Sequence, residues 1–231
     1  MIAKPTSLSA APRLSRREFV QRTGSIALLG AFGGVASAAD AGAKQTSLVG
    51  SNVFGWTQYA RRDKKPFDIV ETMSALRDCG YDYLESFMDF AKPDSVATLA
   101  DQMKSKGLKP VSLYAGARLH EADKAKGVVD QLLAAAKVCK ACGFQVISCN
   151  PSPIGREKTD EELKTQVAAL KDLGQGLKDL GLKLGIHHHL PEMANNAREF
   201  HYNFRNSPPD LVGFCYDVHW VWKGGVPPAE A

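Results

Sequence analysis

Six short β-rich runs alternate with single helical segments from residue 47 onward, and this alternation constrains the fold more than any other feature of the chain. The runs cover Leu48–Val53, Tyr81–Phe87, Pro110–Tyr114, Phe144–Cys149, Leu182–Ile186 and Leu211–Tyr216. The helical segments have apolar residues at three- and four-residue intervals, and they cover Phe67–Cys79, Ser95–Lys106, Lys124–Ala141, Asp160–Leu180 and Met193–Arg205. Because strands that are joined through single helices run parallel, the order predicts a parallel α/β sheet with right-handed crossovers.

Two parallel architectures remain, an open doubly wound sheet and a closed barrel, and the strand ends help to choose between them. After the first run the chain reads Phe54-Gly55-Trp56-Thr57-Gln58, which lacks the glycine fingerprint of a dinucleotide-binding fold, and no P-loop occurs elsewhere. Polar residues stand at or near the ends of the runs instead: Asn52, Glu85, Asn150, His187, His189 and Asp217. In (β/α)8 barrels the active site lies at the rim formed by the C-terminal ends of the strands. We therefore predict a (β/α)8 TIM barrel.

The predicted barrel is incomplete. A full barrel of this kind has about 250 residues, whereas residues 39–231 contain six expected strands. The last residues, Lys223–Ala231, are typical of a loop that leads into a further helix. We therefore predict one barrel domain over residues 39–231, truncated after the sixth strand.

Residues 1–38 have the pattern of an export signal. The string Ser-Arg-Arg-Glu-Phe-Val begins at Ser15 and is similar to a bacterial twin-arginine signal; the apolar run Ser25–Val35 and the small-x-small sequence Ala36-Ser37-Ala38 follow it. The pattern predicts cleavage after Ala38, the twin-arginine export machinery as a partner, and a periplasmic or secreted protein. The apolar run is too short for a bilayer of about 30 Å, which argues against a permanent membrane anchor. The alternative is a disordered basic tail followed by a helix.

The same leader accounts for the positive charge of the chain. Of 29 Lys and Arg residues five lie in residues 1–38, and of 25 Asp and Glu residues one does, so the remaining 24 of each sign balance. Because residues 39–231 have no net charge, they lack the excess of basic side chains that is typical of nucleic-acid-binding proteins.

Cys139 and Cys142 form a C-x-x-C within an amphipathic helical segment. We interpret them as small apolar helix residues, with a disulfide or redox role as the alternative.

The strongest local signal for chemistry is the run His187-His188-His189, with Glu192 three residues after it. Side chains alternate along a strand, so His187 and His189 are expected to face one way and His188 the other. Imidazole and carboxylate ligands suit Mn, Fe, Co and Zn; an exposed histidine run or hydrogen-bonded core histidines are the alternatives. Asp217 ends the next run and is a natural ligand for the same ion, although an Asp there is also common in a turn or as an N-cap.

Weaker signals point to sugar binding. Glu85 shares a face with Tyr81 and Tyr83, where it could act as a general base or accept a hydrogen bond from a sugar hydroxyl; a solvated rim carboxylate is the alternative. Trp56, Trp220 and Trp222 offer flat surfaces for a sugar ring, with buried packing as the alternative.

These motifs resemble the xylose isomerase-like TIM-barrel family, which includes sugar phosphate isomerases/epimerases and AP endonuclease family 2 proteins. The resemblance rests on Asn150-Pro151, LKLGIHHHLPEM at the fifth run and GFCYDVHWVWKGG at the sixth, and it covers residues 47–231. Within this family, the chain is similar to an exported bacterial branch whose fifth strand ends in His-Asn-His-x-x-Glu. The resemblance implies one divalent ion, Mn²⁺ first and Zn²⁺, Co²⁺ or Mg²⁺ next, with Asp217 on the aspartate ligand and His187 in place of a glutamate ligand. It also implies a further His and Glu ligand beyond residue 231.

Together these observations predict a metal-dependent sugar isomerase or epimerase that moves a proton next to a carbonyl through a metal-stabilised enediolate. The assigned residues are His187 and Asp217 for the metal, Glu85, His189 and Glu192 for catalysis, and Asn52, Trp56, Asn150, His219 and Trp220 for the substrate. The expected partner is a free sugar or glycoside, and a homo-oligomer stays open. The alternatives are a metal-assisted lyase or hydrolase on keto-glycosides and a non-catalytic carbohydrate-binding barrel; action on abasic DNA is disfavoured by the neutral body.

Overall fold

The computed structural model describes residues 47–230, so the predicted export signal and its cleavage site lie outside the described residues. The body that starts at Gly50 has one parallel sheet in which each strand pairs with the next in sequence, in the order β1-β2-β3-β4-β5-β6. The strands are β1 (Gly50–Asn52), β2 (Tyr83–Phe87), β3 (Ser112–Gly116), β4 (Val146–Asn150), β5 (Lys183–Ile186) and β6 (Gly213–Phe214). A strictly sequential order is that of a barrel, and these are six of the eight strands of a (β/α)8 fold. The predicted fold class is confirmed.

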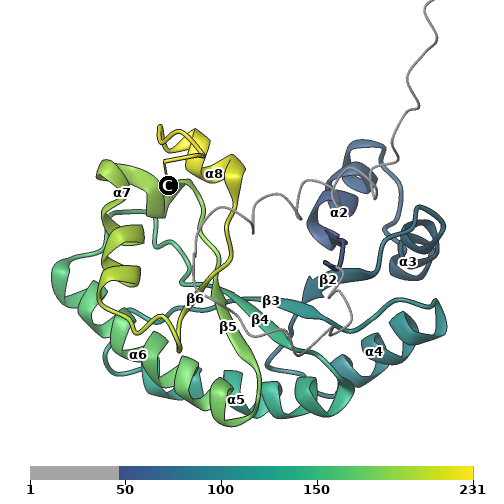
Figure 1. The fold of residues 1–231 in the computed structure, drawn as a ribbon, viewed down its shortest axis with the longest axis horizontal. Coiled ribbons are helices and arrows are strands. Elements are labelled where there is room, and N and C mark those ends of the chain that lie inside the picture. Colours follow the sequence, from purple (N-terminus) through teal and green to yellow (C-terminus); the bar gives the residue numbers. More distant parts are fainter. Residues whose placement is uncertain (1–46, 231) are drawn as a thin grey trace, which may run out of the picture. The chain divides into compact units, whose positions relative to one another are not determined.

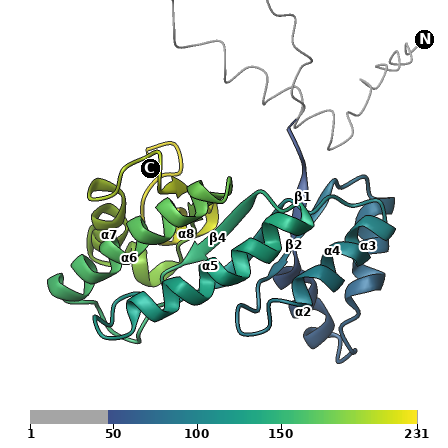
Figure 2. The same ribbon diagram turned by 90° about the horizontal axis from the view of Figure 1, so that it is seen from below.

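The helices are α2 (Val53–Arg62), α3 (Ile69–Asp78), α4 (Ser95–Ser105), α5 (Ala125–Cys142), α6 (Asp160–Asp179), α7 (Leu190–Arg205) and α8 (Val218–Lys223). The helices that connect the strands cover one face of the sheet (Figures 1 and 2), whereas α8 packs against α7. The central helix α5 packs against α4 on one side and α6 on the other. Among residues 47–230, none of the helices is both long and apolar enough to cross a membrane.

Two of these helices were not predicted. The first run was expected to end as a strand at Val53, but Val53 begins α2, because the side chain of Asn52 accepts the backbone N–H of Phe54 (2.7 Å) and caps the helix. A polar turn and then a loop were expected after β6, but Asp217 caps α8, which ends at Lys223. In both places a capping side chain outweighs the β-branched and aromatic residues that suggested a strand or turn.

The alternation of the strands separates a core face from a chemical face. Leu84, Leu113, Ile147 and Ile186 are buried and belong to the core that the helices cover; burying one such side chain contributes roughly 1.5–3 kcal/mol. The residues between them in sequence turn to the opposite face, which in a barrel is the interior. That face carries Tyr83, Glu85, Ser112, Tyr114, Ser148, Asn150 and His187.

One glycine of β1 is required by this arrangement. A Cβ on Gly50 would overlap the ring of Tyr83, its partner across the β1–β2 pair. A side chain at position 50 would therefore displace Tyr83 from the interior face.

The cysteines carry no crosslink. All five lie within residues 47–230 and are free there. Cys139 is fully buried in α5, and burial raises the pKa of its thiol to about 12. This agrees with the interpretation of Cys139 and Cys142 as apolar helix residues.

The N-terminus of α6 gives a test by pH. Glu162 closes a capping box with Thr159 and receives two hydrogen bonds from Arg156 (2.7 and 2.8 Å), and these contacts, the Arg156 bond first, lower the pKa of the Glu162 carboxyl to about 2. Because the folded pKa lies below the ordinary value of 4.5, the stabilisation is complete above about pH 4.5 and is lost as the pH falls to about 2. We expect Glu162→Gln, which can keep the capping bond, to flatten the decline in unfolding free energy across that window. Urea titrations of both proteins in half-unit pH steps measure this, and parallel curves would contradict it.

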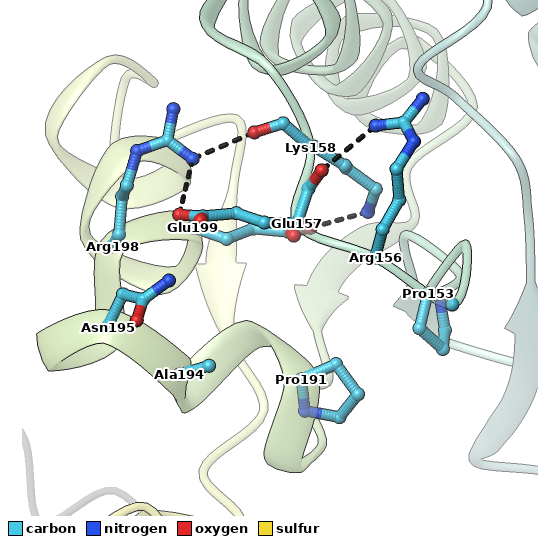
Figure 3. Close-up of a pocket in the computed structure, with 10 residues that line it drawn as sticks. Pro153, Arg156, Glu157, Lys158, Pro191, Ala194, Asn195, Arg198 and Glu199 are labelled. Carbon is cyan, nitrogen blue, oxygen red and sulfur yellow. Dashed lines mark hydrogen bonds and ion pairs between the residues drawn. The ribbon is translucent and has the colours of Figure 1, made fainter.

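Helix α7 contains a left-handed stretch. Asn195, Asn196 and Ala197 have φ of 52°, 57° and 57°, after an extended Ala194, and the right-handed helix resumes beyond them. Ala194 and Asn195 line a pocket (Figure 3). Consecutive left-handed residues other than glycine are uncommon, because each costs roughly 1–2 kcal/mol.

We expect a glycine at the exposed position 196 to be tolerated or stabilising and a valine to be costly. Asn196→Val should unfold with roughly 1–2 kcal/mol less free energy than Asn196→Gly, since a β-branched side chain is poorly compatible with positive φ. Thermal and urea unfolding of the pair measure the difference. The same Gly and Val pair at the exposed, right-handed helical position Ala141 is the control, where glycine should be the worse residue; an identical ranking at both positions would count against the left-handed geometry.

Candidate functional site

The three histidines follow β5 and separate as the strand alternation predicts. The Nε2 atoms of His187 and His189 lie 3.2 Å apart. His188 points the other way and is 1% exposed, with its ring 5.0 Å from that of Phe200 and stacked on Phe214 at 5.6 Å. Two imidazoles therefore meet on the chemical face, while the third anchors the turn in the apolar layer behind it.

Asp217 joins the two histidines from the next strand. Its Oδ2 lies 3.8 Å from Nε2 of His187. Its Oδ1 accepts the backbone N–H groups of His219 (3.0 Å) and Trp220 (3.3 Å) and so caps α8. Asp217 is therefore both an N-cap and a group that faces the histidines. The two roles are compatible because each uses a different carboxylate oxygen.

Burial controls the protonation of His187. Burial, and next the neighbouring His189, lower the pKa of the His187 imidazole to about 4, against an opposing pull from Asp217. The ring is therefore neutral at pH 7. A neutral imidazole is the form that binds a metal ion.

The spacing of these groups fits ligands of one ion. Two ligand atoms that each lie about 2.0–2.2 Å from a metal are roughly 3–4 Å apart, and the His187–His189 and His187–Asp217 separations of 3.2 and 3.8 Å fall in that range. Within residues 47–230 there is nevertheless no group of three or more His, Cys, Asp or Glu side chains that would hold an ion as they stand. The described residues thus bring two imidazoles and one carboxylate close together without forming a metal-binding group.

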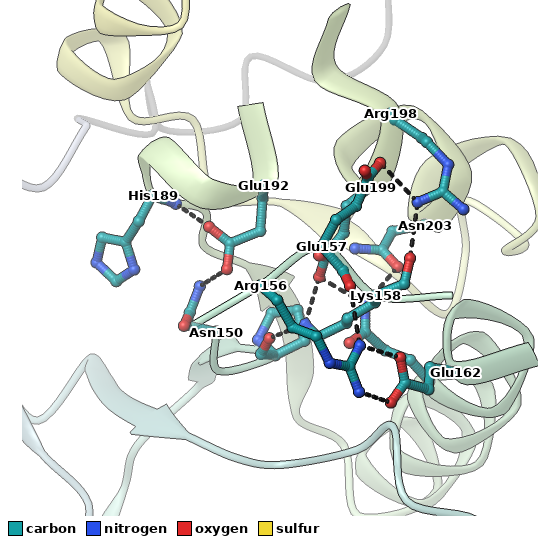
Figure 4. A network of polar contacts seen from close by, with 12 residues as sticks. Asn150, Arg156, Glu157, Lys158, Glu162, His189, Glu192, Arg198, Glu199 and Asn203 are labelled. Carbon is teal, nitrogen blue, oxygen red and sulfur yellow. Dashed lines mark hydrogen bonds and ion pairs between the residues drawn. The ribbon is translucent and has the colours of Figure 1, made fainter. Parts of the chain in front are cut away.

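Glu192 and Asn150 support the histidine turn from behind (Figure 4). Glu192 is 1% exposed, and its carboxylate accepts the backbone N–H of His189 (2.8 Å) and the side-chain amide of Asn150 (3.2 Å). The same amide donates to the carbonyl oxygen of His187 (3.1 Å). These bonds fix the backbone of both histidines; roles for Glu192 in proton transfer and for Asn150 in substrate binding stay predictions.

Glu85 lies on β2 and is hydrogen-bonded to both neighbouring strands. Its Oε1 accepts from Asn52 (2.8 Å) and its Oε2 from the Ser112 hydroxyl (2.5 Å). These two bonds hold the Glu85 carboxylate on the interior face, between β1 and β3.

The predicted aromatic residues divide into two groups. Trp220 lies edge-on to His189 with ring centres 5.5 Å apart, and His219 lies 4.8 Å from Trp220. Trp56 is on α2, packs against the core and donates its indole N–H to Ser51 (3.1 Å). The structure therefore brings Trp220 to the histidines and gives Trp56 a packing role.

Tyr114 was missed from the sequence. Its ring lies edge-on to His187 (5.6 Å) and to Phe87 (5.8 Å). Burial raises the pKa of its phenol to about 12, so the hydroxyl is a neutral donor at pH 7. The period-two pattern Ser112-Leu113-Tyr114 could have placed it on the same face as Ser112.

Comparison with known proteins defines the class. Residues 73–231 match the family described as xylose isomerase-like TIM barrel, and the chain belongs to this family. No curated protein matches the chain.

Solved structures of the same architecture carry isomerase and epimerase names. A sugar phosphate isomerase/epimerase from Parabacteroides distasonis ATCC 8503 is 18% identical with a TM-score of 0.66, over 84% of this chain and 74% of that one. An L-ribulose 3-epimerase is 20% identical with a TM-score of 0.56, over 76% and 62%. The IolI protein with a bound zinc atom is 18% identical with a TM-score of 0.62, over 78% and 66%. At these identities the likeness establishes the fold.

Proposed function

We propose that this chain belongs to a metal-dependent enzyme that isomerises or epimerises a sugar by moving a proton next to a carbonyl. The observation that carries the proposal is the cluster of His187, His189 and Asp217 at the ends of β5 and β6, in a chain of the xylose isomerase-like family. The isomerase and epimerase names of similar structures, and the zinc in one of them, support it.

The donor set fits a divalent transition metal, held by His187 and Asp217. Such an ion would stabilise the negative charge that develops on the substrate oxygens when the proton leaves carbon. The His187 imidazole is neutral at pH 7, the form that binds a metal ion. The Asn150 amide, which also donates to Glu192, donates to the carbonyl oxygen of His187 and holds its backbone in place. His189 stands beside it as a ligand or proton carrier, and we assign Glu85 to proton transfer on the substrate. The Tyr114 ring lies edge-on to His187, and we assign its hydroxyl to hydrogen bonding with the substrate; Trp220 bounds the space next to His189.

Exchange of the substrate proton with solvent tests this reaction directly. The protein is incubated in deuterated buffer with a panel of ketoses and aldoses, after chelation and after addition of Mn²⁺ or Zn²⁺, and NMR measures deuterium entry next to the carbonyl. Exchange that requires the metal supports the proposal. Exchange that survives exhaustive chelation, or release of an aglycone from a keto-glycoside without isomerisation, overturns it; the second outcome would favour the lyase alternative.

We also propose export through the twin-arginine machinery, supported by Arg16-Arg17 and the segment that follows. It favours a free sugar or glycoside over a phosphorylated substrate. Replacing both arginines by lysine should leave the unprocessed chain in the cytoplasm of a bacterial host, as fractionation would measure. Unchanged processing would rule out this route.

A further inference from the structure

A cavity lies close to the histidine turn (Figure 3), and its charged residues are on the side of Glu192 away from the His189 ring (Figure 4). It has a volume of about 500 Å³ and lies between the segment that follows β4 and the start of α7. Pro191, two residues after His189, forms part of its wall, and the Asn150–Glu192 contact lies between the His189 ring and the charged residues of the cavity. A cavity of this size is in the range that holds a small ligand.

The charged residues of the cavity are already paired. Lys158 is 2% exposed, and its ammonium group lies 2.6 Å from Glu199 and donates to the carbonyl oxygen of Pro151 (2.7 Å). Arg198 binds Glu157 (3.0 Å), Asp160 (2.5 Å) and the carbonyl oxygen of Lys158 (2.8 Å).

Arg156 forms the paired contact with Glu162 described above. The three cations thus face four carboxylates, Glu157, Asp160, Glu162 and Glu199. An anion would have to displace a carboxylate from a cation that it already neutralises, so the charge balance disfavours phosphate or a carboxylic acid.

The remaining walls are apolar and one of them is strained. Pro153, Pro191 and Ala194 give flat carbon surfaces, and Asn195 adds an amide from the left-handed stretch of α7. Strained backbone concentrates at ligand sites. A ligand that suits this mixture has hydroxyl groups that both donate to carboxylates and accept from cations, together with C–H faces for the prolines.

We propose that this cavity binds a neutral saccharide unit and is a second sugar site, distinct from the histidine cluster. The ion-paired cations and carboxylates of the cavity would donate hydrogen bonds to the sugar hydroxyls and accept hydrogen bonds from them. This binding does not require a metal. It stands apart from the proposed isomerase reaction, and each can fail without the other.

Filling the cavity tests the proposal. Glucose, maltose and sucrose are titrated into the metal-free protein by calorimetry, with inorganic phosphate as the anionic probe. We expect at least one of the three sugars to bind with a Kd below about 10 mM. Ala194→Phe, which places a ring in the cavity from an exposed extended position, should weaken that binding at least tenfold, and Asn195→Gly, which removes the amide and relaxes the backbone, several-fold. Ala141→Phe, the same change on an exposed face of α5, should bind like the original protein.

The outcomes separate this site from the metal cluster. His187→Ala should keep sugar binding in the absence of metal, whatever its effect on the isomerase reaction. Sugar binding that is unchanged in both Ala194→Phe and Asn195→Gly, no binding of any of the three sugars below about 10 mM, or phosphate that binds more tightly than the sugars would each overturn the proposal.

Discussion

Replacing His187 by alanine is expected to lower the affinity for Mn²⁺ or Zn²⁺ by at least about 100-fold. Loss of a hydrogen-bond partner of a metal ligand already costs 10–100-fold, and loss of a ligand itself should cost more. His187 stands 3.2 Å from His189 and 3.8 Å from Asp217, so its removal breaks both pairs. Competition with a coloured chelator, checked by elemental analysis of the purified protein, measures the affinity.

Two further variants make the test specific. His188→Phe keeps an aromatic ring between Phe200 and Phe214 and should bind metal normally, because this ring lies in the apolar layer and points away from His187 and His189. Asp217→Asn can still cap α8, since Asn is as good an N-cap as Asp, and should lose metal affinity without loss of helix. If His187→Ala bound metal as tightly as His188→Phe, the metal assignment would be wrong.

Replacing Lys158 by alanine is expected to lower the unfolding free energy by roughly 3–5 kcal/mol, because it leaves the charge of the largely buried Glu199 carboxylate unpaired, with a hydrogen bond from the Gln166 amide (3.0 Å) in place of a cation. Removing both charges is a milder change: Lys158→Met with Glu199→Gln should recover much of the loss, since a buried pair and a neutral replacement of similar volume are often close in stability. Urea unfolding of Lys158→Met, of Glu199→Gln and of the double variant gives the coupling energy.

The control for this pair is an exposed ion pair of similar length. Lys126 and Asp130 are 2.7 Å apart on α5 with both side chains largely in solvent, so Lys126→Ala should cost no more than about 0.5 kcal/mol. A Lys158 effect as small as that of Lys126 would show that the Lys158–Glu199 pair does not stabilise the contact between the loop after β4 and α7.

The features that the sequence predicted correctly depend on the order of strands and helices and on the two-residue alternation of side chains along a strand. The strand and helix alternation gave the parallel sheet, and the period of two placed His187 and His189 on one face with His188 on the other. Helices α2 and α8 were missed because their capping bonds compete with residues that favour strands, and only the folded backbone shows which wins.

Long-range polar contacts were outside the reach of a single sequence. Glu192 and Asn150 were both selected as site residues, but their mutual hydrogen bond joins positions 42 apart. The Lys158–Glu199 pair joins positions 41 apart and has no motif. The left-handed stretch in α7 also has no glycine to mark it, because Asn195, Asn196 and Ala197 occupy it.

Because each carboxylate oxygen of Asp217 has its own role, few residue types can replace aspartate at position 217. Serine would start α8 equally well, and glutamate would supply the same charge from one carbon further away, but aspartate does both tasks with one short side chain. The helix therefore holds the carboxylate in its orientation toward His187 before any ligand arrives. Whatever loosens the first turn of α8 should also disorganise the chemistry next to it.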